Sequence, residues 1–422
     1  MNKEFFKKIF IAGLLVVVSA PTLVQSATVG QLQDNIDNHT QKIKQLEEEI
    51  KKYQTQVEAV GNEAKTLQSA IKELDLNQKK ISTEIKMTEV NIQKTELTIE
   101  QLGGQIGDIQ EKIGANTQAI AKTMASMQIQ DDESIIESFL SGKSLSDVLD
   151  EYQSITEFQT KIREQSAELD LHKSDLSVKK TNTEAEKAKL QSLRSELGDQ
   201  NKILNNNKKE KNTLLASTKN KESEYKKILA DKQAQKEQFE KELFDYESQL
   251  KRAIDPKSFP SAKKGIIAYP LDNVFVTQAF GRTVDAKRLY VSGTHNGVDF
   301  RATRGTPVKA VLDGVVEGIG NTDEQRGCYS YGKWVLIKHS NGLTSLYAHL
   351  DLIKAVPGSQ VSEGEIIGYS GQTGYATGPH LHLTLLASQG VTIQQYSSSK
   401  NCKNTKIPIA SPNAYLDPMQ YF

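Results

Sequence analysis

Apolar residues recur every seven positions through the first half of the chain. From Ala27 to Ala253 the sequence has no proline and little glycine. One seam of the repeat is apolar except at Gln78, and its members are Val29, Ile36, Ile43, Ile50, Val57, Ala64, Ile71, Gln78, Ile85, Ile92, Ile99, Ile106, Ile113, Ile120 and Met127. This repeat is typical of a coiled coil, because apolar side chains every 3.5 residues form one continuous face. It predicts a helix of about 100 residues, roughly 150 Å long.

A second heptad run follows from Ile155, and its register shifts after a polar stretch at residues 205–209. Between the two runs, the segment from Asp131 to Asp150 breaks the repeat and predicts a short helical tip at residues 130–150. Two long helices of similar length around a tip favour an antiparallel hairpin over residues 27–253. A parallel homodimer is the alternative, because isoleucine-rich seams opposite leucine also suit dimers. The pattern leaves both arrangements open.

The pattern changes after residue 253. Residues 254–267 have the proline, serine and lysine content of a linker, and glycine and proline become frequent beyond it. Turn signals such as Asn341-Gly342 and Pro357-Gly358 separate short apolar stretches, as in a β-domain. The predicted strands are residues 275–280, 297–302, 308–319, 333–339, 344–349, 365–369 and 380–386. The predicted fold is therefore multi-domain: a long α-helical coiled coil, then a compact, mostly antiparallel β-domain at residues 268–422.

The balance of charges in the chain argues against nucleic acid as a partner. Lys+Arg and Asp+Glu balance at 53 each, so the chain lacks the excess of basic residues typical of a nucleic-acid-binding protein.

The first residues predict a signal peptide. Lys3, Lys7 and Lys8 precede an apolar run, and small or apolar residues precede Ala27, which predicts a signal peptide at residues 1–26. A retained membrane anchor is the alternative, but the run is shorter than the ~20 residues that span a bilayer. We expect an exported chain in the periplasm, the cell wall or the extracellular space.

The sequence has two cysteines, Cys328 and Cys402. In an exported chain, two cysteines can form one disulfide. The alternative is that they ligate zinc, but the absence of a CxxC pair favours the disulfide.

Candidate chemistry gathers near the C-terminal end, at His295, Asp299, His349, His380 and His382. The spacings His295–Asp299 and His380–His382 are even, so each pair shares one face of a strand. On a helix, residues two apart diverge by roughly 200°. A catalytic zinc keeps three protein ligands and one open position, which His295, Asp299 and His382 could provide. His349 and His380 could then relay protons or stabilise an oxyanion. The remaining histidines are interpreted as structural: His39, His172 and His339.

Several motifs in this region resemble the lysostaphin/LytM-type zinc metallopeptidases that cut peptidoglycan cross-bridges. They are Thr294-His295-Asn296-Gly297-Val298-Asp299-Phe300, Gly305-Thr306-Pro307-Val308, Tyr347-Ala348-His349-Leu350 and Gly378-Pro379-His380-Leu381-His382. The resemblance implies zinc (Zn2+) on His295, Asp299 and His382, with His349 and His380 as the catalytic pair. It also implies endopeptidase action on peptide stems or bridges of the bacterial cell wall.

The whole layout is similar to that of EnvC-like cell-separation proteins. Some relatives of that layout have lost metal ligands and only activate separate amidases, whereas all five positions are intact here. We therefore expect a secreted zinc-dependent peptidoglycan endopeptidase (a murein hydrolase) in cell separation or division. The coiled coil would regulate or tether it, self-associate, or dock through the segment from Asp131 to Asp150 to a membrane complex. The alternatives are a non-catalytic amidase activator and a coiled-coil surface or adaptor protein.

Two features depart from the resemblance. An insert at residues 321–327 and a tail segment at residues 394–406 lengthen two loops, and a Cys328–Cys402 disulfide would join them. Thr384 stands where relatives often carry an acidic residue, which would change the support of the metal ligands.

Overall fold

The computed structural model describes residues 29–61, 66–130, 145–250, 255–397 and 399–422. The predicted signal peptide and most of the predicted helical tip lie outside these residues. The chain divides into two compact units, Met1–Asp37 with Glu100–Leu176, and Asn38–Ile99 with Ser177–Phe422. Within the described ranges, no helix combines the length and apolar character needed to cross a membrane.

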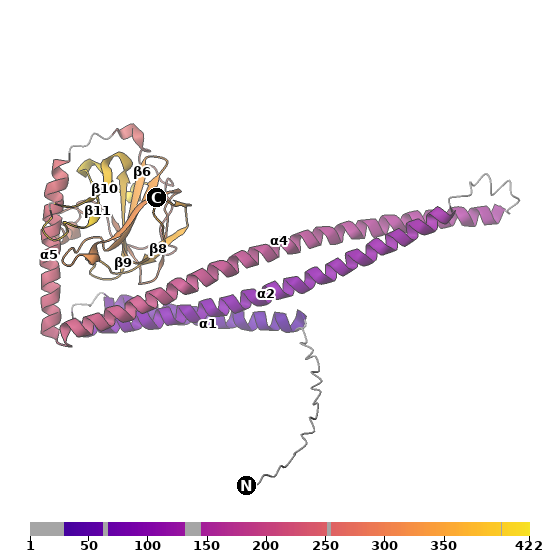
Figure 1. Ribbon diagram of the computed structural model, residues 1–422, viewed down its shortest axis with the longest axis horizontal. Coiled ribbons are helices and arrows are strands. Elements are labelled where there is room, and N and C mark those ends of the chain that lie inside the picture. Colours follow the sequence, from indigo (N-terminus) through magenta and orange to yellow (C-terminus); the bar gives the residue numbers. More distant parts are fainter. Residues whose placement is uncertain (1–28, 62–65, 131–144, 251–254, 398) are drawn as a thin grey trace, which may run out of the picture. The chain divides into compact units, whose positions relative to one another are not determined.

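Long helices form the first part of the chain (Figure 1). They are α1 (Val29–Gly61), α2 (Leu67–Gln130), α4 (Leu145–Thr218) and α5 (Glu222–Gln249). The unbroken heptad register predicted one helix from Val29 to Met127, and this is wrong, because α1 ends at Gly61 and α2 begins at Leu67. Val57 and Val60 of α1 pack in one apolar cluster with Leu76 of α2. The C-terminal end of the apolar seam of α1 is therefore buried against the next helix of the same chain.

The helix α4 continues through the polar stretch at which the register shifts. It ends at Thr218, and Lys219 and Asn220 follow with φ angles of 47° and 57°. Left-handed backbone cannot continue a right-handed helix, so the chain turns there into α5.

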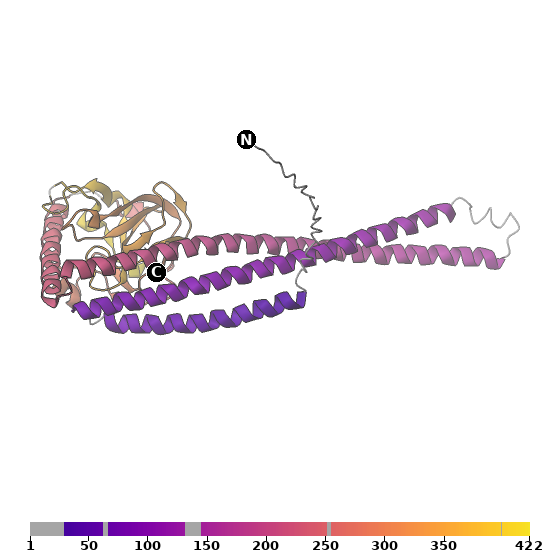
Figure 2. The same cartoon turned by 60° about the horizontal axis from the view of Figure 1, so that its bottom comes forward.

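In the second unit, α2 and α4 lie side by side (Figure 2), and polar contacts join them. Arg194 of α4 donates to Glu96 of α2 at 2.9 Å, and Lys211 of α4 pairs with Asp75 of α2. Because residue numbers rise along one helix while they fall along the other, these segments run antiparallel. For the rest of the coiled coil, the choice between a hairpin and a dimer stays a prediction.

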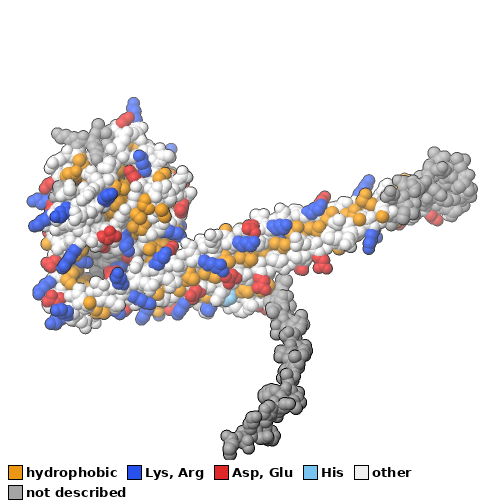
Figure 3. All heavy atoms as spheres, in the orientation of Figure 1, with side chains coloured by type: hydrophobic (Ala, Val, Ile, Leu, Met, Phe, Trp, Pro, Cys, Tyr) orange, Lys and Arg blue, Asp and Glu red, His pale blue; other side chains and the backbone are white. Residues whose placement is uncertain are grey.

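The first unit contains helical segments only, among its described residues. Gln101 of α2 donates to Gln33 of α1 at 3.1 Å. Leu149, Tyr152 and Leu171 of α4 are exposed, and Figure 3 shows apolar side chains among charged ones along the long helices. Self-association of the coiled coil stays a prediction.

The β-domain is built on one twisted antiparallel sheet of ten strands within residues 255–397 and 399–422. Its main strand order is β1-β2-β9-β6-β5-β4-β7, with β12 beside β9 and β8 bridging β6 to β3; β10 and β11 form a separate hairpin. The strands are β1 (Val276–Gln278), β2 (Val298–Arg301), β3 (Pro307–Lys309), β4 (Gly314–Asn321), β5 (Lys333–His339), β6 (Leu343–Ile353), β7 (Gln360–Val361), β8 (Ile366–Ser370), β9 (His380–Ala387), β10 (Val391–Gln395), β11 (Lys406–Ala410) and β12 (Tyr415–Leu416). Short helices are η1 (Pro256–Ser258), α6 (Val284–Leu289), η2 (Thr322–Glu324), η3 (Ser388–Gly390), η4 (Pro412–Ala414) and η5 (Pro418–Gln420).

Both faces of this sheet are covered. On β5, Val335 and Ile337 lie in one apolar cluster while Trp334 and Leu336 lie in another, as alternation along a strand requires. On β9, the residues at 381, 383 and 385 belong to the first cluster. His380 and His382 therefore point to the opposite face, where the candidate site lies.

The predicted fold class is confirmed: long N-terminal helices precede a compact antiparallel β-domain. The stretch 308–319, predicted as one strand, is divided between β3 and β4. The hairpin of β10 and β11 was not predicted, because residues 394–406 were interpreted as a segment that lengthens a loop. A disulfide joins Cys328 and Cys402, and it packs in a cluster with side chains from α5 and this hairpin, namely Phe239, Leu243, Tyr396, Ile407 and Ile409.

Candidate metal centre

Two strands and the turn before one of them bring the predicted metal ligands together. Asp299 on β2 and His382 on β9 are direct cross-strand partners. Side chains in such pairs lie close together on the same face. His295 precedes β2 and forms an isolated bridge with Gly281. A Cβ atom at Gly297 would lie 2.7 Å from the His382 ring, so glycine is required where the backbone passes this imidazole.

The three donor atoms converge on one point. His295 Nε2 lies 3.2 Å from His382 Nδ1 and 3.3 Å from Asp299 Oδ1, and the last two atoms are 2.8 Å apart. Tetrahedral zinc with bonds of about 2.0–2.1 Å separates its ligand atoms by roughly 3.3 Å. All three side chains are buried. The donor set and its spacing therefore fit zinc.

The second nitrogen of each imidazole has its own partner. His295 Nδ1 donates to the Ala279 carbonyl oxygen at 3.1 Å, and His382 Nε2 lies 2.9 Å from the Thr384 hydroxyl oxygen. Such bonds select the tautomer whose free lone pair faces a metal. Thr384, which departs from the acidic residue of relatives, thus still supplies a hydrogen-bond partner.

The charges suit metal binding as well. Burial acts to raise the pKa of the Asp299 carboxyl, but His380 and hydrogen bonds from His295 and His382 outweigh it and hold this pKa well below its usual range. Burial lowers the pKa of His382. A carboxylate and a neutral imidazole are the forms that coordinate a metal.

The backbone turns His349 toward the same site. Its φ angle is 61°, and the pairing of β6 with β5 shifts register near it. The even spacing of Ser345, Tyr347 and His349 predicts that they share one face of a strand, and this is wrong for His349. Tyr347 lies in the first apolar cluster, whereas the His349 ring lies 4.7 Å from that of His380. An irregularity of this kind re-aims a side chain at a functional site.

Backbone carbonyls orient both of these histidines. His349 Nδ1 donates to the Thr373 carbonyl oxygen and His380 Nδ1 donates to that of Gly378, each at 2.8 Å. Each neutral ring then keeps its lone pair on Nε2. Burial, followed by repulsion from His380 and His382, lowers the pKa of His349 well below its usual range. His349 is therefore neutral at pH 7 and able to accept a proton.

A cavity of about 550 Å³ lies over these residues, and the five predicted site residues all line it. The helix α5 forms one wall of this cavity, through Lys236, Phe239, Glu240 and Leu243. The sequence did not predict this wall. The only sign of this contact in the sequence is the shifted heptad register, which includes Phe239 and Leu243. This register predicts an apolar face on α5 but does not identify the surface against which that face is buried.

Polar contacts secure α5 to the β-domain along its length. Lys236 Nζ donates to the Leu289 carbonyl oxygen, and Glu240 accepts from the Val291 amide at 3.2 Å. Further along the helix, Glu242 and Glu247 accept hydrogen bonds from backbone and side-chain groups, namely Ser399, Lys400, Ala410 and Tyr415.

Glu247 is expected to make this contact depend on pH. Burial raises the pKa of Glu247 to about 7, although hydrogen bonds from Ala410 and Tyr415 oppose the shift. The folded protein therefore binds this proton more tightly than the unfolded chain does. The stabilisation is complete below pH 4.5 and disappears as pH rises through about 7. We expect this residue to lower the free energy of unfolding by roughly 3 kcal/mol over that range.

Urea unfolding of the wild-type chain and Glu247→Gln, at pH 4.5 and 8, measures this effect. Because glutamine does not titrate, the difference between the two pH values should be smaller in the variant by roughly 3 kcal/mol. An equal pH dependence in both proteins would contradict the assignment to Glu247.

The other histidines lie elsewhere. His339 is buried, with Nδ1 2.9 Å from the Asp313 carbonyl oxygen and Nε2 2.8 Å from the Ser345 hydroxyl. His172 on α4 lies 3.5 Å from Glu168, and His39 lies on α1. None of these three residues lines the cavity.

The sequence profile described as Peptidase family M23 matches residues 293–394, which contain all five site residues. Residues 293–394 form a peptidase family M23 domain. This family is zinc-dependent, in agreement with the donor set of the metal centre.

Proteins similar to the M23 domain include two curated peptidases. The chain is 40% identical over 120 residues to the DD-carboxypeptidase/endopeptidase Mpg of Neisseria meningitidis, covering 28% of this chain and 26% of that protein. It is 34% identical over 160 residues to the peptidoglycan DD-endopeptidase ShyA of Vibrio cholerae, covering 37% and 33%. The chain thus spans a quarter to a third of these relatives. The catalytic domain of lysostaphin from Staphylococcus simulans is 28% identical, with 35% and 91% covered and a TM-score of 0.26.

Proposed function

We propose that the chain is a zinc-dependent endopeptidase that hydrolyses peptide bonds in peptidoglycan. The observation that carries this proposal is the convergence of three buried donor atoms, with two further histidines in the wall of the same cavity. The names of the relatives Mpg and ShyA, both endopeptidases, support the substrate class.

His295, Asp299 and His382 would hold the metal. Zinc, when bound, polarises a carbonyl group and lowers the pKa of water. His349 is neutral, and its Nε2 accepts the proton of the attacking water because Nδ1 is engaged by Thr373. His380, when protonated, donates from Nε2 to the oxygen on which negative charge develops.

The proposal also covers location and control. The positively charged and apolar start of the sequence supports export to the cell envelope. The similarity of the layout to cell-separation proteins supports a role in division, with the coiled coil as regulator or tether. The position of α5 in the cavity wall supports regulation, because this helix lines the same cavity as His349 and His380.

Digestion of purified peptidoglycan tests the function. We expect the zinc-loaded chain to release fragments with new amino termini in their peptide part, and a chelator to abolish this release. Mass spectrometry of the fragments identifies the bond. Intact muropeptides from a zinc-loaded chain would contradict the proposal. Lysis that requires an added hydrolase would favour the non-catalytic activator.

Loss of one ligand should remove the metal itself. In Asp299→Ala, two neutral imidazoles remain without the carboxylate, and the zinc content should fall from about one ion per chain to near zero after dialysis. The matched control is Asp272→Ala, because Asp272 is an exposed carboxylate paired with Lys309. Elemental analysis measures both variants, and full zinc retention in Asp299→Ala would contradict the ligand set.

A further inference from the structure

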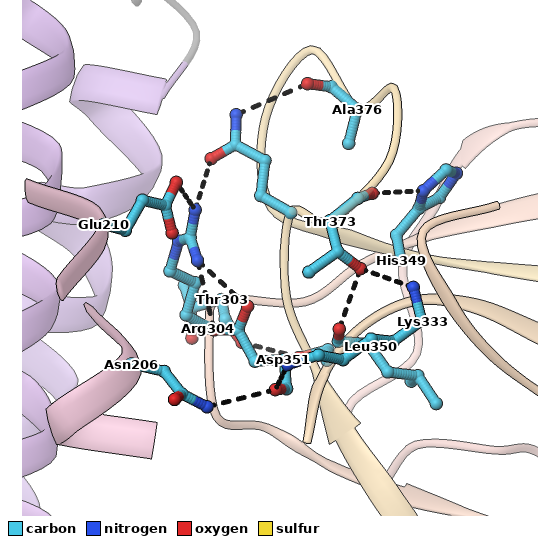
Figure 4. Close-up of polar contacts among 12 residues, drawn as sticks. Asn206, Glu210, Thr303, Arg304, Lys333, His349, Leu350, Asp351, Thr373 and Ala376 are labelled. Carbon is cyan, nitrogen blue, oxygen red and sulfur yellow. Dashed lines mark hydrogen bonds and ion pairs between the residues drawn. The ribbon is translucent and has the colours of Figure 1, made fainter. Parts of the chain in front are cut away.

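A buried arginine lies between the coiled coil and the candidate site. The side chain of Arg304 is 1% exposed and follows β2. Its Nη1 donates to both Asp351 oxygens at 3.0 and 3.2 Å, and its Nη2 donates to Glu210 at 2.8 Å and to Gln372 at 3.1 Å (Figure 4). One guanidinium thus contacts α4, the end of β6 and the loop after β8.

The coiled coil supplies several of the contacts around this cation. Glu210 lies on α4, and Lys80 of α2 donates to the Arg304 carbonyl oxygen at 3.2 Å. Glu73 of α2 is buried nearby, and its charge acts on that of Arg304. A buried cation requires close counter-charges, because the interior solvates it poorly. Without the helices, Asp351 would be the remaining carboxylate in contact with Arg304.

On the other side, Arg304 contacts the loop that orients both proposed catalytic histidines. The Gln372 amide oxygen accepts from Arg304, and its nitrogen donates to the Ala376 carbonyl oxygen at 3.4 Å. Three backbone carbonyls of residues 371–378 accept from the histidines: Gly371 from the His380 amide, Thr373 from His349 Nδ1, and Gly378 from His380 Nδ1.

The loop has little freedom to move independently of this network. A Cβ atom at Gly371 would lie 2.2 Å from Asp351 Oδ1, so the backbone at Gly371 passes close to the carboxylate that Arg304 binds. The Thr373 hydroxyl donates to the Leu350 carbonyl oxygen and accepts from the Lys333 amide. A shift of Arg304 therefore reaches the Thr373 carbonyl, which is visible beside His349 in Figure 4.

We propose that Arg304 is a positioning residue: it couples the docking of α4, through Glu210, to the orientation of His349 and His380. This inference rests on the proposed function and adds the route by which the coiled coil acts on the reaction. When Glu210 is lost, the guanidinium keeps one carboxylate and moves toward Asp351 and Gln372. The backbone carbonyls of residues 371–378 move with it. The three proposed metal ligands keep their positions, because they lie on β2, on β9 and in the turn before β2.

Glu210→Gln is the decisive variant, because it keeps the shape of the side chain and removes its charge. Its matched control is Glu96→Gln. Glu96 is also a coiled-coil carboxylate that accepts from an arginine, at 2.9 Å against 2.8 Å for Glu210, and their side chains are 46% and 47% exposed. Because Glu210 is half exposed, its replacement is expected to leave the fold intact.

The first readout is the ring nitrogen spectrum of the zinc-loaded full chain, labelled with ¹⁵N-histidine. The chain has seven histidines, so each ring can be followed. We expect the Nδ1–H signal of His349 to shift or broaden in Glu210→Gln and to stay in place in Glu96→Gln. Gln372→Leu, which removes the link to the loop, should reproduce the change at His349.

The second readout is the rate on soluble cross-linked muropeptides. We expect kcat of Glu210→Gln to fall about tenfold, the scale for partners that orient a catalytic group, with KM and zinc content within twofold of wild type. The inference is overturned if Glu210→Gln matches Glu96→Gln in both the His349 signal and kcat. If the wild type cleaves no muropeptide but the His349 signal still moves, the coupling stands and the proposed function fails.

Discussion

Replacing His349 with alanine is expected to lower the rate of peptide-bond hydrolysis by about 10²–10⁴-fold, the usual contribution of a general base. His349 is neutral because burial and the neighbouring charges of His380 and His382 lower its pKa. Its Nδ1 is engaged by Thr373, so Nε2 is the atom that accepts a proton. Alanine offers no acceptor at this position. Release of new amino termini from purified peptidoglycan measures the rate.

Two controls separate this effect from damage to the metal centre. His349 is not among the three residues whose donor atoms converge, so the variant should keep its zinc. His172→Ala removes a histidine of α4 that makes one ion pair with Glu168 and should retain the wild-type rate. Hydrolysis by His349→Ala within a few-fold of wild type, with zinc bound, would remove His349 from the proposed mechanism.

Replacing Phe239 with aspartate is expected to raise the rate on polymeric peptidoglycan at least roughly tenfold. Phe239 is 3% exposed, and its ring meets Tyr396 edge-on at 6.0 Å. A carboxylate at this apolar position costs several kcal/mol, since nothing there replaces its hydration. Every 1.4 kcal/mol changes an equilibrium constant tenfold, so this cost should shift the equilibrium of α5 from the docked to the released position. Release of α5 from the cavity wall should then admit the substrate.

Ala234→Asp is the matched control, since Ala234 lies on the exposed side of the same helix. It adds the same charge to α5 without touching the β-domain, and its rate should equal that of wild type. Zinc content and circular dichroism show that Phe239→Asp remains folded. A fall in the rate of a folded, zinc-loaded Phe239→Asp would mean that α5 binds the substrate instead of restricting it.

The sequence predicted the two kinds of structure and the residues of the candidate site. Heptad and two-residue repeats are local signals, and each follows from the geometry of one helix or one strand. The even spacing of His295 with Asp299, and of His380 with His382, placed each pair on one strand face in the same way. Register between β2 and β9 then makes Asp299 and His382 neighbours.

The sequence did not predict features that depend on an irregular backbone. The sequence gives no sign of the break between α1 and α2, because the apolar seam continues across it through Val57, Ala64 and Ile71. His349 was predicted on the face of Tyr347, because alternation assumes a regular strand. A φ of 61° at that residue reverses the side chain.

By itself, then, the sequence predicted the long helices, the β-domain and the five candidate residues for metal binding and acid–base chemistry. The tertiary structure decided which face His349 takes, which surface buries α5, and what surrounds Arg304. Glu210 and Arg304 are 94 positions apart, and Glu242 and Ser399 are 157 apart. Contacts between residues so far apart produce no repeating pattern in the sequence, because they depend on how whole helices and strands pack together.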